Sequence, residues 1–124
     1  MTIAQIPTPW KESVIQVLKN CDSSSIEWKM RPSMDWDQYG FKYEAYELLI
    51  RTLSGPIVGQ DNSAVMVGAE ETWAFLCQHP LNPQTTLYAK IGLKKGHISI
   101  LIFSMHTDLE HGKLEKAIQK FSNN

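Results

Sequence analysis

Apolar and polar residues alternate along residues 87–93, and a second apolar segment spans 98–104. Period-two alternation is typical of β-strands, and Lys94-Lys95-Gly96-His97 between the segments supplies turn residues. We expect an antiparallel hairpin with the pairs Leu93–Ile98, Ile91–Ile100 and Ala89–Ile102. Because strand side chains point alternately to the two faces, Tyr88 and Lys90 should share the face opposite these apolar residues.

Apolar residues at helical spacing predict three helices. The first begins at Thr8-Pro9, a hydroxyl cap followed by proline in the first turn. The second covers 42–53 and is ended by Ser54-Gly55-Pro56. The last follows a capping-box pattern, Thr107 with Glu110, although Gly112 favours a later start.

Shorter segments complete the predicted order of elements. We expect a short strand at 26–30, a loop at 59–63, a possible strand at 64–67 and a firmer one at 71–77. The chain of 124 residues should form one domain, residues 1–124, with an ordinary hydrophobic core. The prediction is an α+β fold: an antiparallel sheet of three to four strands, covered by two N-terminal helices and one C-terminal helix.

Composition excludes several classes of protein. The fractions of apolar (43%) and charged (20%) residues are those of a folded domain, and no apolar run reaches the roughly 20 residues that cross a bilayer. Without a signal segment at the N-terminus, we expect a cytoplasmic protein that does not contact the membrane. The four histidines and two cysteines form no metal-binding motif, and no phosphate-binding loop occurs, so neither a metal nor a cofactor is expected.

Charge is distributed unevenly along the chain. Residues 1–85 carry six basic and ten acidic side chains, whereas residues 86–124 carry six basic and three acidic ones. The predicted hairpin and last helix therefore form the cationic part of a chain whose net charge is −1. This distribution fits a solvated surface as well as it fits a surface that binds nucleic acid.

One group of positions forms a pattern whose clearest part is Tyr88-x-Lys90-Ile91, followed by a second apolar strand ending in serine. The positions of the pattern are Leu18, Asp35, Gly40, Leu49-Ile50, Leu53-Ser54, Trp73, Leu87-Tyr88-Ala89-Lys90-Ile91 and Ile100-Leu101-Ile102-Phe103-Ser104. Together they resemble a known family, the MqsR-type toxins of bacterial toxin–antitoxin modules, within the RelE-like ribonucleases.

The resemblance implies a metal-independent endoribonuclease, an mRNA interferase, in which the ribose 2′-hydroxyl attacks the adjacent phosphate. It also implies RNA as the substrate and a cognate antitoxin as the protein partner. Tyr88, Lys90 and His106 would be the catalytic residues, with histidine suited to proton transfer because its usual pKa is about 6.5. The candidates for substrate binding are Lys94, Lys95, His97 and Trp73.

Three features depart from the family pattern. The glutamine expected after the tryptophan is Ala74, and the lysine beyond the second helix is replaced by a neutral residue near Gln60. The chain also continues into a last helix. In strict alternation His106 lies opposite Tyr88 and Lys90. Joining the three requires a bend or bulge near Ser104-Met105, or a His106 that already lies off the strand.

Other functions remain open on the sequence alone. A non-catalytic binding protein, such as an antitoxin or immunity protein, could present acidic residues to a basic partner; these are Asp35, Asp37, Glu44, Glu47, Glu70 and Glu71. A small-molecule pocket could form among the dense aromatic residues of 28–46, although aromatic residues are more often core. Catalysis by Cys77 is the weakest alternative, because free cysteines usually pack as small apolar residues.

Overall fold

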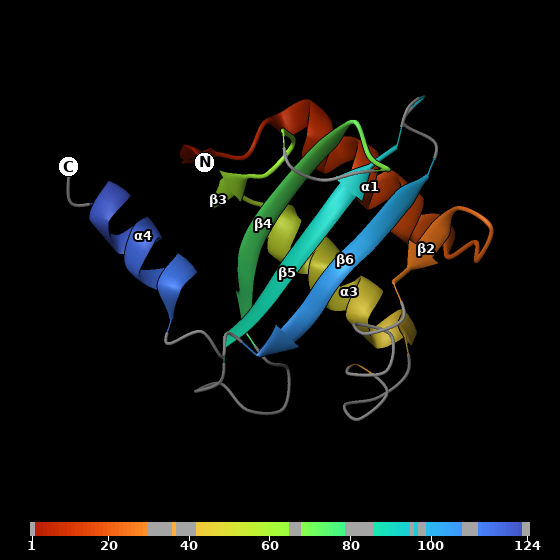
Figure 1. Cartoon of the computed structure of the whole chain (residues 1–124). Helices are drawn as coiled ribbons and strands as arrows, with labels where there is room; N and C mark the ends of the chain where they lie inside the picture. The colour runs from red at the N-terminus through yellow and green to blue at the C-terminus, as the bar shows by residue number, and fades with distance from the viewer. Residues whose placement is uncertain are drawn as a thin grey trace.

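The computed structural model describes residues 2–29, 36, 42–64, 68–78, 86–94, 96, 99–107 and 112–122, with the backbone alone at 106 and 107. Along the chain the elements are β1 (Thr2–Gln5), α1 (Thr8–Asn20), β2 (Ile26–Trp28), α3 (Lys42–Leu53), β3 (Val58–Asp61), β4 (Glu71–Gln78), β5 (Thr86–Leu93), β6 (Ile100–Thr107) and α4 (Lys113–Ser122). Figure 1 shows this α+β arrangement, with the sheet in front of α1 and α3.

One mixed sheet organises the described part of the chain. Its six strands lie in the order β1-β3-β4-β5-β6-β2. Neighbouring strands are antiparallel except β2, which runs parallel to β6 at one edge. The α+β class is therefore confirmed, but the predicted antiparallel sheet of three to four strands was too small and lacked the parallel edge strand.

The two missed strands are β1 and β3. Residues 59–63 had been predicted as a loop, because Gly59 and Asp61 are typical loop residues. Instead β3 pairs with β1 on one side and β4 on the other. A Cβ atom at position 59 would lie 2.6 Å from the carbonyl oxygen of Ala74. Glycine therefore permits a close approach of two strands here.

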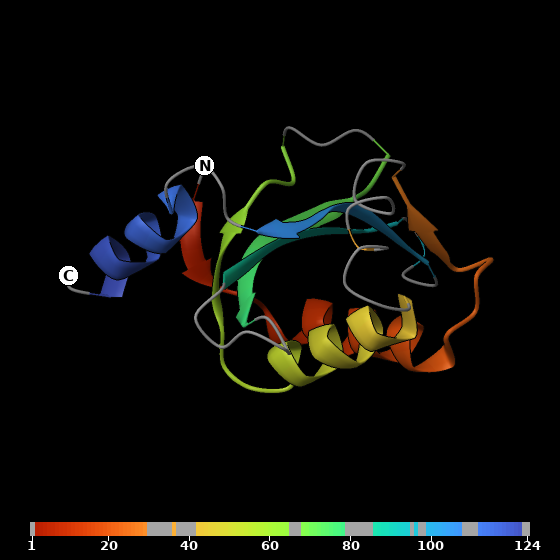
Figure 2. The same ribbon diagram turned by 90° about the horizontal axis from the view of Figure 1, so that it is seen from below.

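Helices α1 and α3 cover one face of the sheet, as Figure 2 shows from below. Apolar stripes on both helices meet the inward-facing residues of β4, β5 and β6, and the core includes Trp10, Val14, Leu18, Leu49, Leu53, Phe75, Leu87, Ala89, Ile91, Ile102 and Met105. The Trp10 and Phe75 rings meet edge to face at 6.4 Å. Lys11, also buried, donates a hydrogen bond of 2.8 Å to the carbonyl of Gly55, which ties α1 to the end of α3.

The helix boundaries confirm some predicted signals and correct others. The α3 range agrees with the prediction of 42–53. Helix α1 does begin at Thr8, but its N-cap is Pro7 and no side chain caps it, so the predicted role of Thr8 was wrong. The predicted capping box was also wrong, because Thr107 belongs to β6 and α4 begins only at Lys113.

Helix α4 contacts β1, β3 and β4 at the side of the sheet, away from α1 and α3 (Figures 1 and 2). Leu114 is its one buried residue, while Phe121 is 41% exposed. Among the described residues, no helix has the length and apolar character that a bilayer crossing requires.

Candidate functional site

The face of the sheet opposite α1 and α3 carries the candidate site (Figure 1). The cross-strand register places Ala74 opposite Lys90, and Lys90 opposite Ser104. On the other side of Ala74 its partner is Gln60 of β3. Directly paired residues share a face of the sheet, so Gln60, Ala74, Lys90 and Ser104 form one row across four strands. We call these four residues the polar row.

A β-bulge in β6 creates this row. Ile91 pairs with Ile102, but Lys90 pairs with Ser104, so Phe103 has no partner on β5. The extra residue reverses the alternation of the strand: before the bulge Ile102 faces the core, and beyond it Ser104 lies beside Lys90. Of the alternatives that the sequence left open, a bulge is therefore present, one residue earlier than expected.

The hairpin register differs from the prediction as well. Leu93 pairs with Ile100, Ile91 with Ile102, and Ala89 with Met105, so each predicted pair was wrong. Beyond the bulge, the backbone of His106 is the direct partner of Tyr88. The side chain of His106 lies outside the described residues.

Lys90 is half-buried in the polar row. Burial lowers the pKa of its ammonium group from the ordinary lysine value, because the charged form loses solvation. Within the described residues, no acceptor or carboxylate lies within bonding distance of its Nζ atom. A partly desolvated ammonium group without a protein counter-ion attracts an external anion.

Ala74 is completely buried, whereas the other described members of the site, Tyr88, Gln60 and Ser104, are half-buried like Lys90. Tyr88 pairs with Leu76 of β4 on one side and with His106 of β6 on the other. The side chains of Gln60 and Ser104 are half-buried and make no hydrogen bond to any described residue. Sequence reasoning had not selected either residue as a site member. The signal that could have identified Ser104 is its position at the end of an apolar strand. Gln60 gave no such signal, because it lay in a predicted loop.

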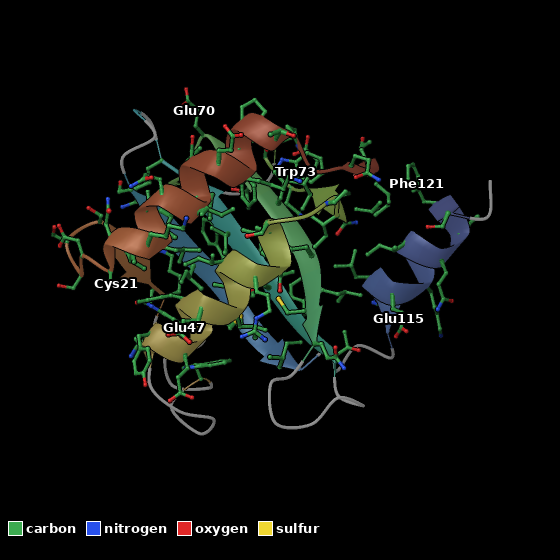
Figure 3. All side chains as sticks on the ribbon, turned by 180° about the vertical axis from the view of Figure 1, so that it is seen from behind. Cys21, Glu47, Glu70, Trp73, Glu115 and Phe121 are labelled. Carbon is green, nitrogen blue, oxygen red and sulfur yellow. The ribbon has the colours of Figure 1, made fainter. Side chains whose placement is uncertain are left out.

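Trp73 lies apart from Tyr88 and Lys90. It pairs with Ile91 on the helix-covered face and is only 4% exposed. Its Nε1 atom donates a hydrogen bond of 2.9 Å to the carboxylate of Glu71. Figure 3, drawn from the side of α1 and α3, shows Trp73 near the end of α1 that follows β1. The predicted substrate-binding tryptophan is thus a core residue.

Lys94 of the hairpin end forms an ion pair with Glu27 of β2, with an Nζ–Oε1 distance of 2.8 Å. This hydrogen bond is the main reason that the pKa of Glu27 is lowered. Lys94 therefore has a carboxylate partner, whereas Lys90 has none among the described residues. The other two predicted substrate-binding residues at this turn, Lys95 and His97, lie outside the described residues.

The alternative sites find less support in the geometry. Cys77 is buried, and burial raises the pKa of its thiol to about 12, so it stays protonated at neutral pH and is a poor nucleophile. No cluster of three histidine, cysteine, aspartate or glutamate side chains suited to a metal occurs among the described residues. Trp28 donates a hydrogen bond of 2.9 Å to the Tyr46 hydroxyl, and Trp36 is buried in the core, so these aromatic residues pack together.

The acidic residues that would define a protein-binding surface do not lie together. Glu44 and Glu47 belong to α3, whereas Glu70 precedes β4. Figure 3 shows Glu47 and Glu70 well separated on the two sides of α1. Asp35 and Asp37 lie outside the described residues.

Comparisons with known proteins were made at three levels. Profiles of protein families, curated protein sequences and solved structures all yield no match to this chain.

Proposed function

We propose that this protein is a metal-independent endoribonuclease of the toxin–antitoxin type, which cuts single-stranded RNA on the helix-free face of its sheet. Lys90 binds a non-bridging phosphate oxygen, and His106 transfers a proton to or from the reacting oxygens. Tyr88 orients the phosphate or stacks on an unpaired base, an interaction worth about 1–3 kcal/mol per base. The products are a 2′,3′-cyclic phosphate and a free 5′-hydroxyl.

The bulge at Phe103 is the observation that carries this proposal. Without it, alternation would put His106 and Lys90 on opposite faces; with it, the backbone of His106 pairs with Tyr88, two residues from Lys90. Bulges are common beside active sites, where they redirect a side chain. The absence of any described counter-ion at Lys90 supports an anionic ligand at the same place.

The chemistry needs these three residue types for separate reasons. Attack by the 2′-hydroxyl requires a base, and the leaving 5′-oxygen requires an acid, both of which imidazole can supply near neutral pH. The phosphorane-like transition state gains negative charge on its non-bridging oxygens. A preorganised ammonium group stabilises that charge more strongly than it stabilises the ground state.

Such an enzyme would be toxic to the cell that makes it, so the proposal includes an antitoxin that binds this chain. An antitoxin that covers the helix-free face would block Lys90 directly. In this proposal the protein partner regulates the nuclease, and binding that partner is not the main function of the chain.

Cleavage of a labelled single-stranded RNA in EDTA tests the proposal. Wild-type protein should cut it and arrest growth when expressed in bacteria. Lys90→Ala and His106→Ala should each lower the cleavage rate at least about 100-fold, because they remove charge stabilisation and proton transfer. Lys19→Ala is the matched control: it removes an exposed lysine of α1, on the opposite side of the sheet, and should retain near-wild-type cleavage.

Two results would contradict the proposal. One is the absence of both cleavage and growth arrest with folded wild-type protein. The other is equal loss of cleavage in the Lys19→Ala and Lys90→Ala variants, since cleavage would then depend on general positive charge and not on the site.

A further inference from the structure

Gln60 and Ser104 flank Lys90 in the polar row, one on each side. Neighbouring strands are about 4.8 Å apart, so Ser104 is adjacent to Lys90, while Gln60 lies roughly 10 Å away across Ala74. Alanine at the middle position has no side chain long enough to separate a glutamine from a lysine. The Gln60 and Lys90 side chains can therefore reach toward one another above Ala74.

Each polar group of the row has hydrogen-bonding capacity that the described protein does not use. The Ser104 hydroxyl, the Gln60 amide and the Lys90 ammonium group form no hydrogen bond with a described residue, although all three side chains are half-buried. Partial burial removes some of the hydrogen bonds that water would make to these polar groups. They therefore gain most from a ligand that supplies those hydrogen bonds in place of water. Three donors in one row of the sheet, on β3, β5 and β6, suit a ligand with several oxygen acceptors.

We infer that Gln60 and Ser104 are substrate-binding residues that complete an RNA-backbone subsite around Lys90. Ser104 and Lys90 donate to the non-bridging oxygens of one phosphodiester. Gln60, across Ala74, donates its amide to the neighbouring nucleotide of the same strand. The RNA therefore crosses the sheet from β6 towards β3, perpendicular to the strands.

The inference rests on the proposed ribonuclease function, but it makes a separate claim about which neutral groups hold the substrate. A positive charge releases a counterion when it meets a phosphate, whereas a neutral donor does not. Removing Lys90 should thus change both the affinity for RNA and its dependence on salt. Removing Gln60 or Ser104 should lower the affinity and leave the salt dependence unchanged.

The experiment measures fluorescence anisotropy of a labelled single-stranded 2′-O-methyl oligonucleotide, which has no free 2′-hydroxyl and cannot be cut by this route. We expect Ser104→Ala and Gln60→Ala each to bind about tenfold more weakly than wild type, the value of one hydrogen bond to a charged group. Gln60→Glu, which keeps the side-chain size but repels phosphate, should bind more weakly still. Lys90→Ala should reduce the slope of log affinity against log salt by about 0.7.

Gln16→Ala is the matched control, because Gln16 is an exposed glutamine on α1, away from the polar row. If Gln60→Ala and Ser104→Ala bind like Gln16→Ala while Lys90→Ala is weakened, the inference about the row is wrong and the proposed function stands. If Lys90→Ala also binds like wild type, or wild type has no affinity, both are wrong. Thermal melting of each variant identifies a loss of fold, and Gln60→Glu then replaces a Gln60→Ala variant that fails to fold.

Discussion

The two faces of the sheet differ in what their side chains do, although the same strands supply both. On the helix-covered face, Phe75, Ala89 and Ile91 are completely buried and have no polar atoms to satisfy. On the helix-free face, their neighbours in sequence, Leu76, Tyr88 and Lys90, are half-buried. The comparison teaches that one face stabilises the domain by apolar burial, while the other is left partly polar and available for a ligand.

The largest expected difference between the faces is in stability. Phe75→Ala removes a completely buried ring that contacts Trp10, and should lower the free energy of unfolding by about 3–5 kcal/mol. Leu76→Ala, one residue further on and on the opposite face, should cost about 1 kcal/mol because the side chain is only half-buried. Urea denaturation of both variants measures the difference. Equal costs would mean that both faces contribute equally to the core.

A smaller effect tests how tightly the helix-free face is packed around Gly92. Gly92 lies on this face, and a Cβ atom there would overlap the Cβ of Ala69 and stand 2.8 Å from the Phe103 ring. Gly92→Ala should therefore destabilise the domain by about 1–3 kcal/mol through overpacking. Gly55→Ala, where no atom lies within 4 Å, should stay within about 0.5 kcal/mol of wild type. A neutral Gly92→Ala variant would show that the segment around Ala69 is not packed against β5.

The smallest expected effect concerns pH and Lys90. Because burial lowers the pKa of this ammonium group in the folded protein, the group loses its proton below the ordinary lysine range. Its unfavourable contribution to stability is fully present below the folded pKa and disappears as pH rises from the folded pKa to the ordinary lysine pKa. RNA affinity should accordingly fall on the alkaline side at a lower pH than an exposed lysine would produce.

Lys90→Arg provides the control for this pH effect, because a guanidinium group stays protonated throughout the accessible range. Anisotropy titrations from about pH 7 to pH 10 should show an alkaline loss of affinity that begins at a lower pH in wild type than in Lys90→Arg. Identical profiles would assign the alkaline loss to another group.

Local patterns predicted the individual elements well. The helix at 42–53 and the strands around 71–77 and 87–93 follow from apolar periodicity and from the Ser54-Gly55-Pro56 break, all of which act within a few residues. The predicted hairpin register was wrong because the turn residues alone do not determine the length of the loop between the two strands. Strand β5 ends at Leu93 and β6 begins only at Ile100, which shifts every pair.

The candidate site was predictable only in part. Tyr88 and Lys90 were selected from their strand and their resemblance to a known motif, and the structure places both on the helix-free face. Trp73 was misjudged because a tryptophan in an apolar strand can point either way, and the helices on one side bury it. Gln60 was missed because its four-residue strand exists only through pairing with β1 and β4.

The amino-acid sequence by itself determined which segments become helices and strands and that their apolar faces must meet, since propensity and periodicity are properties of neighbouring residues. Only the tertiary structure decided that the sheet has six strands, that β2 joins it in parallel, and that a bulge at Phe103 aligns Ser104 with Lys90. These features depend on hydrogen bonds between residues far apart in the chain. Such pairings are selected by the packing of the whole domain.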